Sequence, residues 1–172
     1  MGKKKRDKKY WKRRFGDLGP ETIEPYYHHF DLRRFDNLDD EGFAYLLTSV
    51  KGVNMLDLNE TEITNESIAI LPRLEYVYEL RLKGVYGIDN GCIPDLNKLD
   101  QLSFLHVNHT GITIDGLLQL TNLQALRTLL FTADDAESIR EEILQLHALL
   151  PQCELVVNSK PQYFEEEQNW QV

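Results

Sequence analysis

Histidine and cysteine are the residues of this sequence best suited to metal binding or nucleophilic chemistry. His28 and His29 fall in the first of a series of predicted short strands, and His106 and His109 fall at the fourth. Neighbouring parallel strands lie ~4.8 Å apart, so three steps separate the two pairs by roughly 14 Å. One metal ion cannot bind both pairs, and neither pair has the helical i, i+4 spacing that many zinc enzymes use. The histidines therefore predict no metal centre.

The two cysteines, Cys92 and Cys153, lie far apart and form no CxxC pair. Cys92 could act as a reactive thiol, but no histidine stands near it in the sequence, and small buried cysteines are common. Two isolated cysteines favour neither a disulfide framework nor a zinc site, and they fit a reducing compartment. The motifs GxxxxGK[ST], GxGxxG, GxSxG and HExxH are also absent. We therefore expect a cytoplasmic protein that is not an enzyme and takes no cofactor and no small-molecule substrate.

A strongly basic segment opens the chain. Residues 1–14 carry nine basic side chains against one acid, Asp7, for a net charge of +8, and the remaining residues carry −17, which gives −9 for the whole chain. Cations neutralise phosphates and aromatic rings stack on exposed bases, so this arm is a candidate for binding RNA or a ribonucleoprotein. The candidate nucleic-acid-binding residues are Lys3, Lys4, Lys5, Arg6, Lys8, Lys9, Tyr10, Trp11, Lys12, Arg13 and Arg14.

Other partners also fit the basic arm. It could bind an acidic protein surface, the acidic face of this same chain or an anionic membrane surface, or serve as a flexible solubilising tail. The arm has no apolar stretch behind its charges and is rich in Lys and poor in Ser, so we expect neither a secretory signal nor a transit peptide. No apolar run approaches the ~18 residues that a bilayer-spanning helix needs, so we expect no transmembrane segment.

Six apolar–x–apolar pairs recur along the chain, and their second members are spaced by 26, 24, 25, 24 and 26 residues. The pairs are Phe30 and Leu32, Leu56 and Leu58, Leu80 and Leu82, Leu105 and Val107, Leu129 and Phe131, and Leu155 and Val157. Each pair is typical of a short strand with one buried face, and the stretches between them carry apolar residues at helical intervals. Each strand–turn–helix unit can bury its apolar face only against its neighbours, so we expect six strands side by side in one parallel array.

Two units carry a more specific pattern, VNMLDLNETEITNESIAIL from residue 53 and LSFLHVNHTGITIDGLLQL from residue 102. Both resemble LxxLxLxxTxITxxGLxxL, which is similar to the leucine-rich repeat in its 24–26-residue, ribonuclease-inhibitor-like or cysteine-containing form. The resemblance implies an α/β leucine-rich-repeat solenoid with parallel strands on the concave face and helices on the convex face. It also implies that the side chains of Thr61 and Thr110 bond to the backbone as the chain turns, and that Ile63 and Ile112 pin the turn to the core.

Local signals mark the ends of the helices. Asn65 and Asp115 are expected as helix N-caps, and Asp134 or Asp135 is expected to cap the last and longest helix. The unit at 77–101 departs from the repeat pattern because Val85 occupies the position of the turn threonine. The local turn geometry of that unit is therefore left open.

These patterns also set the domain organisation. The chain divides into a basic arm at 1–15, a capping segment at 16–26, the repeat domain at 27–158 and an acidic, aromatic tail at 159–172. We expect the capping segment to be a loop that lays Tyr26 and Tyr27 against the first unit. A looser resemblance concerns order alone, since an IDNGC turn, ITIDGL, a longer helix and LPQCELVV follow one another as in the mitochondrial ATP synthase coupling factor B group.

Strand residues between the inward apolar ones are expected to face solvent on the concave side. They mix charges with apolar and aromatic side chains, which suits a protein or peptide and does not suit a phosphate backbone, although ordinary solvated strands also fit. The candidate protein-binding residues are Met55, Tyr78, Arg81, Lys83, Phe104, His106, Asn108 and Leu130. The leading hypothesis is an adaptor whose arm docks on RNA or a ribonucleoprotein while its concave face binds a protein. The alternative is a pure protein-interaction module, such as an inhibitor or an assembly factor, whose arm binds an acidic protein or a membrane.

Overall fold

The computed structural model describes residues 8–35 and 37–164, which form a mixed α/β fold around one open sheet. The strands are β1 (Tyr26–Asp31), β2 (Gly52–Asp57), β3 (Tyr76–Arg81), β4 (Phe104–His106), β5 (Thr128–Phe131), β6 (Glu154–Val157) and β7 (Lys160–Pro161). They pair in chain order, in parallel from β1 to β6, and β7 adds to β6 in the antiparallel sense. The expected α/β class and the expected parallel array of six strands in chain order are confirmed.

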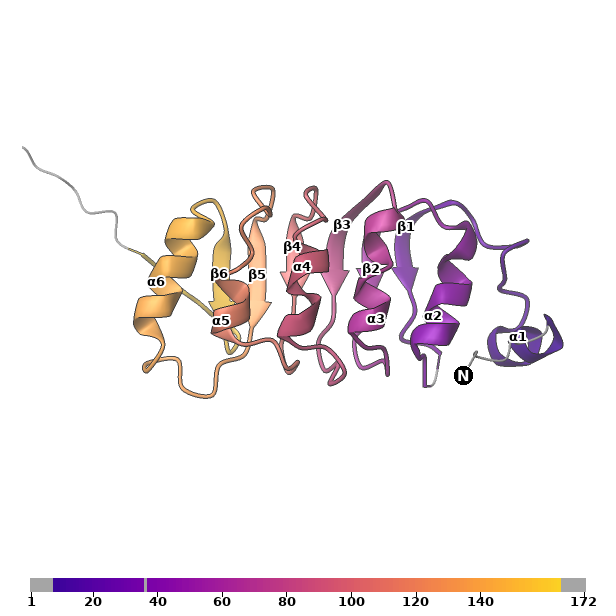
Figure 1. The fold of residues 1–172 in the computed structure, drawn as a ribbon, viewed down its shortest axis with the longest axis horizontal. Helices are drawn as coiled ribbons and strands as arrows, with labels where there is room; N and C mark the ends of the chain where they lie inside the picture. Colours follow the sequence, from indigo (N-terminus) through magenta and orange to yellow (C-terminus); the bar gives the residue numbers. More distant parts are fainter. Residues whose placement is uncertain (1–7, 36, 165–172) are drawn as a thin grey trace, which may run out of the picture.

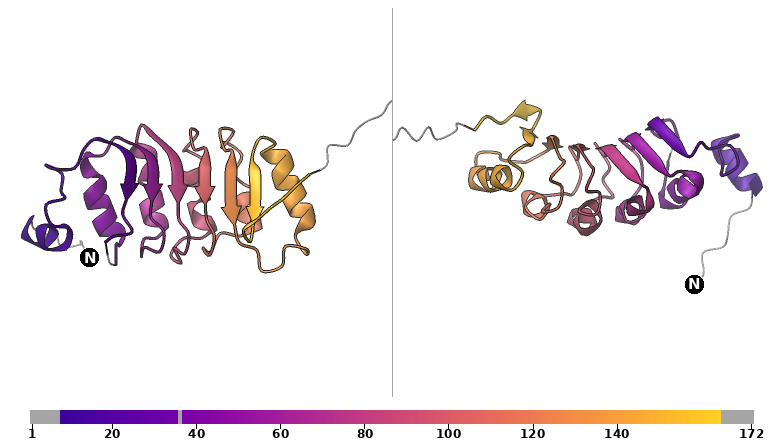
Figure 2. Two further views of the ribbon diagram at one scale, coloured as in Figure 1. Left: turned by 180° about the vertical axis from the view of Figure 1, so that it is seen from behind. Right: turned by 90° about the horizontal axis from the view of Figure 1, so that it is seen from above.

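One helix precedes β1, and a helical segment follows each strand from β1 to β5. The α-helices are α1 (Lys8–Phe15), α2 (Asp40–Leu46), α3 (Asn65–Ile68), α4 (Ile93–Leu96), α5 (Ile114–Leu117) and α6 (Arg140–Leu149), and the 3-10 turns are η1 (Leu47–Ser49), η2 (Leu71–Arg73) and η3 (Asn90–Cys92). Helices α2 to α6 lie side by side on one face of the sheet (Figure 1). Seen from above, the strands follow the inner side of a shallow arc and the helices its outer side (Figure 2). The opposite face of the sheet carries none of these helices.

The repeat spacing read from the sequence equals the step between paired strands. Each first member of an apolar pair has the next first member as its Cα partner, from Phe30 at β1 through to Leu155 at β6. The second members, from Leu32 to Val157, are also buried. A one-residue slip would turn this whole set to solvent, so the aliphatic rows hold the register.

Threonines shape the turns of two units as expected. The Thr61 hydroxyl donates to the Leu58 carbonyl at 2.7 Å, and the Thr110 hydroxyl donates to the Val107 carbonyl at 2.8 Å. Val85, which takes this position in the third unit, has no hydroxyl and is fully buried in the core instead. The third unit keeps only the backbone hydrogen bond of this turn, from the Val85 amide to the Leu82 carbonyl at 3.2 Å.

The expected helix caps are off by one residue or more. Thr64, not Asn65, precedes α3, and its side chain accepts from the Glu66 amide, while α5 begins after Thr113 rather than after Asp115. The side chain of Asn65 instead bonds to the next unit, donating to the Asp89 carboxylate at 2.6 Å and accepting from the Asp89 amide at 3.1 Å. A short polar side chain at a helix start can serve either role, so the sequence alone did not separate them.

The last helix also starts later than expected. The Asp135 carboxylate accepts from the amides of Glu137 and Ser138 in a turn that precedes α6, which begins at Arg140. The aspartate therefore caps this turn and not the helix itself.

Asp40, at the start of α2, joins the first two units. Its carboxylate accepts from the Thr64 amide and hydroxyl, both at 2.8 Å, and from the Ser67 hydroxyl at 2.5 Å. Burial acts to raise the pKa of Asp40, but the hydrogen bonds from Ser67 and Thr64 outweigh it and lower the pKa below its ordinary value. The charged form of Asp40 is thus the one that holds the units together.

Both ends of the array are covered by side chains of the flanking segments. At the first end, Trp11, Phe15 and Ile23 are buried against the first unit, so the arm from Lys8 onward is a packed helix and not a free tail. At the other end, the Phe164 ring stacks on the His147 ring of α6 with a centroid distance of 3.9 Å. The tail therefore contacts the body at Phe164, whereas residues 165–172 lie outside the described part of the chain.

Candidate protein-binding surface

Two rows of side chains run across the sheet face that the helices leave uncovered. The register places Met55, Glu79, Phe104 and Thr128 in one row and Asp57, Arg81, His106 and Leu130 in the next. Five of the predicted contact residues therefore come together here: Met55, Arg81, Phe104, His106 and Leu130. Each of the five is partly exposed. Tyr78 and Lys83 lie beside these rows with exposed side chains.

A row of stacked tyrosines borders this face at the start of the strands. The Tyr26 and Tyr76 rings stack with centroids 6.3 Å apart, and Tyr76 stacks on Tyr78 at 4.7 Å. Gly52 lies between Tyr26 and Tyr76 in the register, and a Cβ there would meet the Tyr76 ring at 2.5 Å. The missing side chain lets two strands that are not neighbours share one aromatic stack. Tyr26, expected in a capping loop, is instead the first residue of β1 and is 47% exposed.

Sequence reasoning missed this tyrosine stack, although a signal for it was present. Tyr26, Gly52 and Tyr76 are spaced by the same 26 and 24 residues as the core aliphatics. They therefore had to form a row across three strands. The Tyr26 hydroxyl also donates to the Glu75 carboxylate at 3.0 Å, and this hydrogen bond raises the pKa of the phenol.

Arg81 lies at the centre of the uncovered face. Its guanidinium carbon sits 5.2 Å from the centroid of the Phe104 ring, and Phe104 meets His106 edge-on at 6.5 Å. The guanidinium also pairs with the Glu79 carboxylate at 3.3 Å, in an ion pair whose side chains are both 34% exposed. Arginine stacked on an aromatic ring is a frequent anchor of protein interfaces.

Polar atoms without a partner gather around Arg81. In the described part of the chain, four buried side-chain nitrogen or oxygen atoms have no hydrogen-bond partner, and three of them are Arg81 Nε, His106 Nε2 and Asn108 Oδ1. Each such group costs roughly 1–3 kcal/mol when it is left unpaired. Burial lowers the pKa of His106, and the positive charges of Lys83 and Arg81 lower it further. His106 is therefore neutral at pH 7.

Two residues expected to face solvent are in fact buried. Asn108 is 6% exposed and Asp57 is 2% exposed. Both sit at the end of a strand: the Asp57 carboxylate accepts from the Asn59 amide, and the backbone carbonyl of Asn108 accepts from the Gly84 amide of the preceding unit. Asn108 is thus part of the floor of the surface rather than an exposed contact.

The β1 end of the face carries an ion-pair cluster. The Arg33 guanidinium pairs with Asp31 at 2.7 Å and with the buried Asp57 at 3.4 Å. The hydrogen bonds from Arg33 lower the pKa of Asp31 to about 2 and, with the charge of Asp57, raise the pKa of Arg33. These charges are neutralised within the chain, which leaves the region around Arg81 and Lys83 as the electropositive part of the uncovered face.

The helix α1 uses most of its functional groups within the chain. Trp11 is 7% exposed and its ring stacks on the Tyr45 ring at 4.4 Å, so it is not free to stack on a base as the sequence had suggested. Tyr10 is partly buried and packs edge-on against Trp11 at 4.9 Å. Of the other predicted nucleic-acid contacts, Lys3, Lys4, Lys5 and Arg6 lie outside the described residues.

Three cations of α1 are engaged in ion pairs. Lys8 pairs with Glu21 at 2.9 Å, Lys12 with Asp17 at 3.6 Å, and Arg14 with Asp39 at 3.0 Å. Lys9 and Arg13 are exposed and make no ion pair with the part of the chain that the structure describes.

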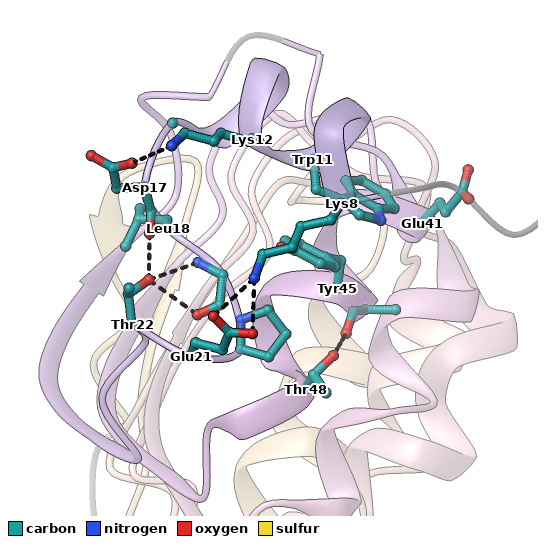
Figure 3. A pocket seen from close by; sticks show the side chains of 14 residues that line it. Lys8, Trp11, Lys12, Asp17, Leu18, Glu21, Thr22, Glu41, Tyr45 and Thr48 are labelled. Atoms are coloured by element: carbon teal, nitrogen blue, oxygen red, sulfur yellow. Dashed lines mark hydrogen bonds and ion pairs between the residues drawn. The ribbon is translucent and has the colours of Figure 1, made fainter.

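A pocket of about 1010 Å³ opens between α1, the segment at 16–22 and α2 (Figure 3). Trp11 and Tyr45 form its aromatic wall, and the Lys8–Glu21 ion pair lies across it. Gly16, with a φ of +66°, turns the chain back from α1 to make the opposite wall. No histidine or cysteine lines the pocket.

The other candidates for chemistry do not converge. A second pocket of about 550 Å³ is lined by His109 and the exposed Tyr86 among others, away from both cysteines. Burial raises the pKa of the Cys92 thiol to about 12, and Asp89 adds to this effect. Within residues 8–35 and 37–164, no three His, Cys, Asp or Glu side chains are placed to hold a metal ion. In the same residues no helix has the length and apolar character needed to cross a membrane.

Comparison with known proteins adds no relative: no protein-family model matches the chain, and no curated protein matches it.

Proposed function

We propose that this chain is a leucine-rich-repeat protein whose repeats stack as a short solenoid. The support comes from the fixed step of 24 to 26 residues between paired leucines and from the threonine-bonded turns at Thr61 and Thr110. Each unit adds one strand and one helical segment, so each buries its apolar face against the next. The two free, buried cysteines fit a place of action in the reducing cytoplasm.

We infer further that the protein acts by binding another protein on the uncovered face of its sheet and not by catalysis. One observation carries this proposal: the face that the helices leave open carries the stacked Arg81 and Phe104, and the Tyr26–Tyr76–Tyr78 stack borders it. Side chains of this kind dominate the energy of protein interfaces. The partly exposed polar groups around them supply the rim that such interfaces need.

Affinity capture with matched variants tests this function. The variant Phe104→Ser removes the ring beneath Arg81, and Leu144→Ser removes a 49% exposed leucine from the helix side of the molecule. We expect Phe104→Ser to lose a partner that the wild type and Leu144→Ser both retain. Loss of that partner from Leu144→Ser alone would place the interface on the helices and overturn the assignment.

A second candidate function is docking of α1 on RNA or a ribonucleoprotein, which the exposed Lys9 and Arg13 favour. Deletion of residues 1–14 is a poor test, because it also removes Trp11 from the core. Replacing Lys9 and Arg13 by Gln keeps the helix packing and removes two exposed charges. If α1 binds RNA, the double variant binds it more weakly. The slope of the logarithm of the binding constant against the logarithm of salt concentration also becomes shallower, by the amount expected for up to about two phosphate contacts. Unchanged RNA binding would place the RNA site away from Lys9 and Arg13, and no RNA binding by the wild type would leave the pure protein-interaction module.

A further inference from the structure

The centre of the uncovered face is a hydrogen-bonding site that the chain itself leaves incomplete. Arg81 and His106 are Cα partners on β3 and β4, so their side chains lie next to each other on one face. Arg81 Nε and His106 Nε2 are both buried without a partner among residues 8–35 and 37–164, and so is Oδ1 of Asn108, two residues further along from His106. The Gly84 amide donates to the backbone carbonyl of Asn108 at 2.9 Å, so Lys83 precedes a residue that is bonded to the chain just after β4.

The charges around this site favour an anion. Arg81 and Lys83 contribute two cations, and both act on His106, whose pKa is lowered by burial and then by these charges. The nearby carboxylates are already engaged: Glu79 pairs with Arg81, and Asp57 pairs with Arg33. The remainder of the chain is acidic, so a local positive site at the middle of the sheet marks a point of charge complementarity.

We propose that Arg81, Lys83 and His106 recognise a carboxylate side chain in an extended acidic peptide segment of the protein partner. This inference rests on the proposed protein-binding function and adds the chemistry of the partner. The carboxylate competes with Glu79 for the Arg81 guanidinium and takes a second hydrogen bond from His106, in the tautomer with its proton on Nε2. Lys83 neutralises the remaining charge. The Phe104 ring beneath Arg81 packs against the apolar part of the segment.

The existing contacts permit this exchange. The Arg81–Glu79 ion pair is long at 3.3 Å and partly exposed, so an incoming carboxylate displaces a weak interaction. Arginine binds carboxylates in two-pronged geometry, so a carboxylate that displaces Glu79 can gain a second hydrogen bond from the guanidinium. An RNA strand is a less suitable occupant, because the face between Tyr78 and Leu130 presents two cations next to Glu79 and Asp57 rather than a continuous basic groove.

The test uses the full chain labelled with ¹⁵N and two capped model peptides. One is acetyl-Gly-Phe-Glu-Phe-Glu-Gly-amide, and its twin carries Gln in place of both Glu residues. We expect the Glu peptide to shift the amide resonances of Arg81, Lys83, His106 and Asn108, with an affinity about ten-fold higher than that of the Gln peptide, as a charged hydrogen bond provides. The double variant Arg81→Gln, Lys83→Gln removes that preference, while Arg73→Gln, which takes one exposed cation from the helix side, retains it. Thermal unfolding checks that both variants fold.

Three outcomes overturn the inference, and they differ in what they leave standing. If both peptides bind the strand face equally, the carboxylate recognition fails while protein binding on that face stands. If neither peptide shifts these resonances and both shift residues on the helices, the proposed function fails as well. If an eight-nucleotide oligouridylate shifts the same four residues more strongly than the Glu peptide, the site is one for RNA.

Discussion

The indole ring of Trp11 stacks on the phenol ring of Tyr45, with centroids 4.4 Å apart and planes 11° from parallel. This contact joins a helix from the basic arm to the first helix of the repeated array. Phe15, one turn later in α1, stacks on Trp11 at 5.7 Å and extends the same cluster. The charged arm and the body are therefore one packed unit from Lys8 onward.

Truncating Trp11 should destabilise the protein at this end. We expect Trp11→Ala to reduce the free energy of unfolding by about 3 kcal/mol, because a large buried aromatic side chain is lost with its ring contacts. Chemical denaturation followed by circular dichroism measures the change. The control Lys9→Ala lies on the exposed side of the same helix, and its effect should stay within about 0.5 kcal/mol. Equal stability of the two variants would contradict the packing of α1.

Charge on Asp40 should link stability to pH. The folded pKa of Asp40 is lowered, so its stabilising effect is complete above the unfolded pKa of ~3.9 and disappears as pH falls through the lower folded value. We expect Asp40→Asn to cost about 1 kcal/mol at pH 7, an amount reduced by the partial exposure of the side chain. The variant should lose less further stability than the wild type between pH 5 and pH 2. Asp100→Asn, an exposed control, should follow the wild type; an identical pH profile for Asp40→Asn would refute the link.

The tyrosine stack depends on the absence of a side chain at Gly52. A Cβ there meets the Tyr76 ring at 2.5 Å, so Gly52→Ala should push the ring out of the stack. We expect a cost of about 1 kcal/mol from overpacking and a changed near-ultraviolet circular dichroism spectrum. In a Tyr76→Ala background the same substitution should be nearly neutral. A cost that persists in that background would show that Gly52 is needed for another reason.

Both thiols should be inert in the folded protein. Burial raises the pKa values of Cys92 and Cys153 to about 12, so almost no thiolate forms at pH 8. We expect a thiol reagent such as dithionitrobenzoate to react with neither cysteine until the chain is unfolded, and then with both. Rapid labelling of Cys92 in the native state would reopen the possibility of a reactive thiol there.

The sequence predicted the features that repeat and missed those that depend on a single local choice. The leucines of the strands had to share one face at one spacing, so their register from Phe30 to Leu155 followed from the pattern alone. The choice between Thr64 and Asn65 as the helix cap did not follow from the pattern, because either side chain can bond to the backbone or across to the next unit.

The candidate site also contains some features that the sequence predicted and others that it did not. The strand period placed Arg81, Phe104 and His106 on one face, but it carried no information on how side chains partner one another. The burial of Asn108 and the stacking of Trp11 on Tyr45 arise from contacts between segments far apart in the sequence, where periodicity has no bearing.

Site-specific photocrosslinking tests the binding role of the uncovered face most directly. Benzoylphenylalanine replaces Phe104 in one protein and Leu144 in another, and both are irradiated in native extract. The proposed function predicts a discrete crosslinked partner at position 104 that is absent at position 144. Crosslinks to the same partner at position 144 with none at position 104 would contradict it.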